Sequence, residues 1–167
     1  MGVVSRIYLR PSSRTPVKQV RRTRAVAGRG LEGDHAGGGS RQVTLLSEEA
    51  WEVACDDLGR TDLEPGTRRA NIVVRGVDLG ETIGGGLRIG ECVVKVAAET
   101  RPCRLMEDAA PGLQKALDPD RRGGVYGRIL AGGEIEVGDD VFVVAPDDAA
   151  LRDGQAQLPF AEGTEVE

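Results

Sequence analysis

The chain has 167 residues, of which 29% are charged, with a net charge of −5 and three cysteines. This length fits one domain with a single hydrophobic core. Aromatic residues make up only 3% of the chain, so we expect a core of Val, Leu, Ile and Ala and few stacking surfaces for single-stranded nucleic acid. The odd cysteine count, without C-x-x-C spacing, argues against a disulfide framework and a structural zinc site.

Charge is unevenly distributed along the chain. Eight basic and no acidic residues precede Glu32, whereas six acidic residues and one basic residue follow Val144. The basic residues alternate with apolar ones, which favours the solvated face of a strand over an anion site and over nucleic-acid binding. The acidic end lacks apolar periodicity. We therefore predict one domain over residues 1–144 and a weakly ordered or surface-draped extension over residues 145–167.

The sequence gives no sign of a membrane or secretory protein. Arg6 and Arg10 interrupt any apolar segment of a signal peptide. No stretch approaches the ~20 apolar residues that a membrane span needs. We expect a cytoplasmic protein, present as a monomer or homodimer, with no membrane or nucleic-acid partner.

Short apolar runs separated by glycine-rich turns dominate the chain. The expected strands cover residues 3–9, 17–27, 41–46, 70–75, 87–90, 93–98, 125–131, 134–137 and 141–144. No strand–glycine loop–helix unit of a dinucleotide-binding fold is present. The pattern predicts a mainly β protein, a barrel or sandwich with one or two peripheral helices.

The most distinct helix signal follows Ser47. This residue is a good N-cap, and Glu48 and Glu49 would lie in the first turn, where the helix dipole favours acidic residues. Trp51, Ala54, Cys55 and Leu58 form an apolar stripe before Gly59, a natural stop. Cys55 should therefore face the core, without a chemical role. A second short helix is expected after Pro111.

Cys103 is the candidate nucleophile or metal ligand. It follows the strand over residues 93–98, which Pro102 should end, and it lies between Arg101 and Arg104. Nearby positive charge favours the thiolate, which is the reactive and metal-binding form. A buried structural cysteine is the alternative interpretation, because free cysteines are often buried.

Several polar residues could bind an anionic ligand. Asp34 could hold the imidazole of His35, the only histidine, in one tautomer, or could simply form an Asx turn. Arg68, Arg69 and Asn71 lie at the start of a strand and suit a phosphorylated heterocycle, unless the arginines bridge Glu64 or Asp62 at the surface. Arg41, Arg101, Arg104 and Arg128 lie at further strand ends. Together they suggest a positive barrel mouth around one thiolate.

These motifs occur in the order and spacing of the MOSC domain family, named after the C-terminal region of molybdenum cofactor sulfurases, which this chain resembles. The matching segments are 33–35 (GDH), 41–45 (RQVTL), 66–79 (GTRRANIVVRGVDL), 87–90 (LRIG), 102–103 (PC), 123–125 (GGV) and 137–141 (VGDDV). They span roughly residues 28–144.

The resemblance implies a MOSC-type β-barrel that binds the molybdenum cofactor, a molybdopterin-type group. In relatives similar to the mitochondrial amidoxime-reducing component, the Pro-Cys cysteine binds molybdenum, which implies this role for Cys103. The Arg-x-Asn-Ile pattern there contacts the pterin or its phosphate, which implies cofactor binding by Arg69 and Asn71. Asp34, His35 and Arg41 match further positions of the family pattern, and Arg128 is grouped with them as a cofactor-binding candidate.

The resemblance leaves several functions open. The chain could carry the cofactor or handle its sulfur, passing it to a receiving enzyme. It could instead reduce N-hydroxylated compounds with an external electron-donor protein, or carry sulfur as a persulfide without metal. A structural module with a partner on its acidic end is the remaining alternative. The two-domain relatives have an N-terminal β-rich half without a counterpart in residues 1–27, so we expect a more open site or a second chain that completes it.

Overall fold

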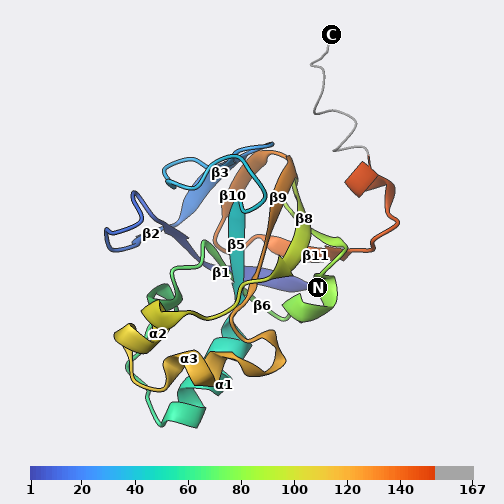
Figure 1. The fold of residues 1–167 in the computed structure, drawn as a ribbon. Coiled ribbons are helices and arrows are strands. Elements are labelled where there is room, and N and C mark those ends of the chain that lie inside the picture. The colour runs from blue at the N-terminus through green and yellow to red at the C-terminus, as the bar shows by residue number, and fades with distance from the viewer. Residues whose placement is uncertain (153–167) are drawn as a thin grey trace.

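Seven strands close into a barrel (Figure 1). The structure, a computed structural model, describes residues 1–152. Closure depends on β11 (Asp140–Val144), which pairs with β7 (Gly86–Ile89) on one side and with the start of β1 (Gly2–Leu9) on the other. Between β7 and β1 the order is β8 (Cys92–Glu99), β9 (Val125–Ala131), β5 (Val43–Ser47) and β6 (Ile72–Arg75). The expectation of a mainly β barrel is confirmed.

A small second sheet lies beside the barrel. It consists of β10 (Gly133–Glu136), β3 (Arg22–Val26) and β4 (Gly30–Leu31). The single strand expected over residues 17–27 is wrong in this respect: β2 (Lys18–Val20) pairs with the end of β1, whereas β3 pairs with β10. The chain changes sheets at Arg21, because β2 forms a hairpin with the preceding strand β1, whereas β3 pairs with β10, a strand far along the sequence (Thr23 opposite Ile135).

Aliphatic side chains fill the barrel interior. The largest fully buried ones include Ile7, Leu45, Ile72, Leu87 and Ile129. Residues of β5 alternate, so that Val43 and Leu45 point into the barrel and Leu46 points outward into a second cluster. The predicted core of Val, Leu and Ile is therefore present, and it leaves the interior packed.

Three short helices cover the outside of the barrel wall that β5 and β6 form. α1 (Glu48–Leu58) begins at the N-cap Ser47, whose hydroxyl accepts from the Ala50 N–H (3.1 Å), and ends at Gly59 in the left-handed conformation. It links the parallel pair β5 and β6, which requires such a crossover. Trp51 and Cys55 are buried, as predicted.

α3 (Leu113–Leu117) packs against α1, and α2 (Arg104–Ala109) packs against α3 (Figure 1). α3 is the helix expected after Pro111, whereas α2 was not expected. Short 3-10 turns occur at Pro65–Arg68, Leu79–Thr82 and Pro119–Arg121.

Only the first part of the predicted C-terminal extension is described. Leu151 is buried against Val93, Leu130 and Val144 on the outside of the barrel. Residues 153–167, which carry four of the six acidic residues counted after Val144, lie outside the described residues. Within residues 1–152, no helix is long and apolar enough to cross a membrane.

Candidate functional site

An arginine-rich cleft of about 380 Å³ lies against the outer barrel wall at Thr44, next to α2. Its lining residues are Arg10, Arg41, Thr44, Leu45, Arg68, Arg69, Ala70, Thr100, Arg101, Cys103, Leu105, Met106 and Gly123. Five of these are arginines and none is acidic. Most of the lining residues lie next to strand ends: Arg10 follows β1, Thr100 follows β8, and Gly123 comes shortly before β9.

Cys103 lies in this cleft and is exposed. β8 ends at Glu99, and after Pro102 the chain enters α2 with Cys103 at the N-cap position. The other two cysteines are buried: burial raises the pKa of the Cys55 thiol and raises the pKa of Cys92 to about 12. Among the three cysteines, Cys103 is therefore the one available for chemistry.

Arg68 fixes the segment that carries Cys103. Its Nε donates to the Gly123 carbonyl (2.9 Å), and its Nη2 donates to the carbonyls of Thr100 (3.0 Å) and Arg101 (3.4 Å). Within residues 1–152 it has no carboxylate partner, so burial lowers the pKa of this guanidinium. The predicted alternative of a surface bridge to Glu64 or Asp62 is wrong. Those carboxylates bind Arg6 and Arg60, respectively.

Thr100 adds an unpaired polar atom beside Arg68. The residue is 8% exposed, and its hydroxyl is buried without a hydrogen-bond partner. Gly123 allows this close packing, because a Cβ atom there would lie 2.5 Å from the Thr100 carbonyl oxygen. An unpaired buried hydroxyl costs about 1–3 kcal/mol.

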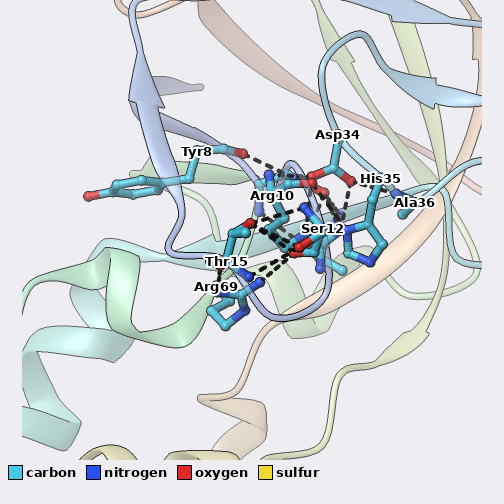
Figure 2. Close-up of polar contacts among 10 residues, drawn as sticks. Tyr8, Arg10, Ser12, Thr15, Asp34, His35, Ala36 and Arg69 are labelled. Carbon is cyan, nitrogen blue, oxygen red and sulfur yellow. Dashed lines mark hydrogen bonds and ion pairs between the residues drawn. The ribbon is translucent and has the colours of Figure 1, made fainter.

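A buried ion pair joins Arg10 and Asp34 (Figure 2). Asp34 accepts from the Nε (3.1 Å), Nη2 (3.0 Å) and backbone N–H (2.7 Å) of Arg10. The Asn71 amide links to both residues: its Oδ1 accepts from Arg10 Nη2 (3.2 Å), and its Nδ2 donates to Asp34 (3.1 Å). Asn71 is fully buried and also bonds to Thr44 and the Tyr8 carbonyl.

The charge state of Asp34 follows from these contacts. Burial favours the neutral acid and would raise its pKa, but the hydrogen bonds from Arg10 and Asn71 and the Arg10 charge outweigh that effect. The pKa of Asp34 is therefore lower than its usual value of 3.8.

His35 and Asp34 do not form the expected carboxylate–imidazole contact. The His35 Nδ1 lies 3.1 Å from the Arg10 carbonyl oxygen, and the ring is exposed. Asp34 instead accepts from the Ala36 N–H (3.2 Å), as an Asx turn does. His35 lines a separate loop pocket that also includes Arg29 and Asp34.

The remaining predicted site residues differ in position. Arg41 lines the cleft and stacks over the Tyr126 ring, with its guanidinium carbon 4.6 Å from the ring centre. Arg69 lines it too, but donates to the carbonyls of Ser12 (3.2 Å) and Thr15 (2.7 Å), as Figure 2 shows. Arg128, on β9, is not among the lining residues.

The sequence matches the MOSC domain family over residues 32–142, which is more than half of the chain. The chain belongs to the MOSC domain family. A search of curated proteins found no match.

Solved structures show the same fold. YiiM from Geobacillus stearothermophilus is 19% identical, with a TM-score of 0.68, covering 98% of this chain and 94% of that one. YuaD from Bacillus subtilis is 18% identical, with a TM-score of 0.69 and coverages of 84% and 94%. YiiM from Escherichia coli is 16% identical, with a TM-score of 0.63 and coverages of 86% and 70%.

This MOSC domain contains cleft residues that its motifs alone did not single out. Arg10 and Thr100 lie outside the segments that match the family pattern, each directly after a strand. Within residues 1–152, no group of three or more His, Cys, Asp or Glu side chains is arranged to hold a metal ion. The cleft therefore offers one thiol and many cationic donors, a combination that suits a ligand with negative charge and a soft reactive atom.

The unpaired hydroxyl of Thr100 gives a stability prediction. We expect Thr100→Val to leave the free energy of unfolding unchanged or to raise it by about 1 kcal/mol, because a methyl group replaces an unpaired polar atom. Thr82→Val is the matched control: Thr82 is also buried, but its hydroxyl donates to the Leu79 carbonyl (2.6 Å), so its loss should cost about 1 kcal/mol. Urea unfolding measures both. Equal losses in the two variants would contradict the account.

The Asp34 ion pair gives a pH prediction. Because its folded pKa lies below the unfolded value, the stability it contributes is present above about pH 4 and is lost as the pH falls through the folded pKa. At pH 7, Asp34→Asn should lower the free energy of unfolding by about 3 kcal/mol. The gap, that is, the difference in the free energy of unfolding between wild type and Asp34→Asn, should stay constant from about pH 8 to pH 5 and narrow below about pH 4. A gap that stays constant to about pH 2 in urea unfolding would refute it.

Proposed function

We propose that this MOSC domain binds the molybdenum cofactor in the arginine-lined cleft, with the Cys103 thiolate as a ligand of the metal. The observation that carries this is the exposed Cys103 among five arginines with no acidic residue in the lining. The MOSC family is known for molybdenum cofactor binding, which supports this ligand over other anions.

The residues present fit the cofactor. A thiolate is a soft ligand and suits a molybdenum centre that already has sulfur ligands from its own pterin. Arginine forks suit the phosphate of the pterin. When bound, the cofactor supplies a redox-active metal centre. The absence of a multi-residue metal cluster within residues 1–152 agrees with a metal that brings its other ligands along.

The protein's own contribution is to hold these groups in place. Arg68 fixes the carbonyls of Thr100 and Arg101, three and two residues before Cys103, so the thiol starts from a defined position. Arg41 is held flat by Tyr126 and can face an anionic or planar group. Met106 and Leu105 add apolar surface to the lining.

A carrier role fits this open arrangement better than independent turnover. Cys103 is exposed and Leu105, two residues on, is 61% exposed, so that a second protein can reach the ligand. We infer that the partner is an enzyme that receives the cofactor or its sulfur.

The ligand role of Cys103 predicts a loss of metal. Protein purified from cofactor-producing cells should retain molybdenum and pterin, and Cys103→Ala should reduce the molybdenum content at least tenfold, because a metal–thiolate bond is lost. Cys55→Ala is the matched control, since that cysteine is buried in the helical layer and should leave the metal content unchanged. Molybdenum is measured by elemental analysis and pterin by fluorescence after oxidation.

Equal molybdenum contents in wild type and Cys103→Ala would contradict the ligand role. Metal-free protein with an additional sulfur atom on Cys103, detected by mass and removed by a thiol reductant, would support sulfur carriage instead.

A further inference from the structure

We propose that Arg10 contacts the anionic ligand of the cleft, and that Asp34 and Asn71 are positioning residues that hold Arg10 rather than ligand contacts themselves. The inference rests on the proposed function in one respect, namely that the cleft binds a ligand with anionic oxygen atoms. It assigns a residue that the motif comparison had not selected and gives two motif residues a different task.

In the described part of the chain, the Arg10 guanidinium keeps one nitrogen free of protein partners. Its Nε and Nη2 are both occupied by Asp34, and Nη2 also by Asn71. Within residues 1–152, its Nη1 has no hydrogen-bond partner and is not among the buried unpaired atoms. Because Arg10 lines the cleft, this leaves a fixed donor that a ligand oxygen can reach.

Asp34 and Asn71 have no free side-chain group for a ligand. The Asp34 side chain is 0% exposed, and its two oxygens accept from Arg10, Asn71 and the Ala36 N–H. Asn71 is 0% exposed, and its amide is bonded at both ends. Neither residue lines the cleft.

The loop that follows Arg10 is held in place by Arg69. After Arg10 the chain turns through Ser12 and Thr15, whose carbonyls accept from Arg69. Arg69 therefore holds the loop that follows Arg10, while Asp34 holds the Arg10 side chain. A guanidinium that is already held in place loses less entropy when a ligand binds.

If Asp34 acts through its charge, Asp34→Asn changes anion affinity in one direction; if it acts by positioning Arg10, the affinity changes in the other. Asp34 reduces the positive charge near the cleft, so Asp34→Asn makes the cleft more positive and would tighten anion binding if net charge alone decided affinity. If Asp34 acts by positioning Arg10, the same substitution releases the fork and weakens binding. The direction of the change separates the two.

The test uses the cofactor-free full chain and inorganic pyrophosphate as the anion, with affinity measured by titration calorimetry. We expect Asp34→Asn to weaken binding about tenfold, the effect of about one charge-assisted hydrogen bond. Arg10→Lys keeps the charge but loses the fork, and should weaken binding by a similar factor. Because both act on one group, Arg10→Lys with Asp34→Asn should be no weaker than Arg10→Lys alone.

The matched control breaks an ion pair of the same type elsewhere. Arg60 and Asp62 form a two-contact pair (2.7 and 2.8 Å) at an exposed site, and neither lines the cleft. Asp62→Asn should leave pyrophosphate affinity unchanged.

Three results would overturn the proposal. The wild type does not bind pyrophosphate, folded Asp34→Asn binds it as tightly as the wild type or more tightly, or Arg10→Lys binds it as tightly as the wild type. Circular dichroism reports folding, and Arg10→Lys decides if Asp34→Asn does not fold. If pyrophosphate binding depends on Arg10 but the purified chain retains no molybdenum, the result supports the role of Arg10 and contradicts cofactor binding.

Discussion

The buried ion pair between Arg10 and Asp34 ties together the segments that form the cleft. Arg10 follows β1, Asp34 lies in the loop before β5, and Asn71 joins both of them to Thr44 on the barrel wall. Removing one partner of a buried pair leaves an uncompensated charge and costs about 3–5 kcal/mol. The pair therefore fixes local structure, and it also allows a guanidinium to remain beside an otherwise uncompensated set of positive charges.

Three of the cleft arginines are held in place by uncharged groups. Arg68 and Arg69 donate to backbone carbonyls, and Arg41 stacks on Tyr126. Carbonyl dipoles and an aromatic face stabilise a guanidinium without cancelling its charge. The charge remains available to a ligand, and the donors already have defined positions, which lowers the entropy cost of binding.

The elements that the sequence predicted correctly depend on residues close together in the chain. Ser47, the apolar stripe of α1 and Gly59 act within one helix, and the glycine-separated β runs indicated a mainly β fold, a barrel or a sandwich. The break between β2 and β3 depends on the pairing of β3 with the distant strand β10, and α2 depends on the burial of Met106 in the helical cluster. In the site, Cys103 follows from its place after a strand and a proline. The Arg10–Asp34 contact spans 24 positions, so no local pattern could reveal it.

The central claim is that the Cys103 thiolate is a ligand of molybdenum within this cationic cleft. X-ray absorption at the molybdenum edge, on protein loaded with the cofactor, measures this most directly because it counts the sulfur neighbours of the metal. The account predicts one more sulfur neighbour in the wild type than in Cys103→Ser. Identical sulfur shells in the two proteins would contradict it.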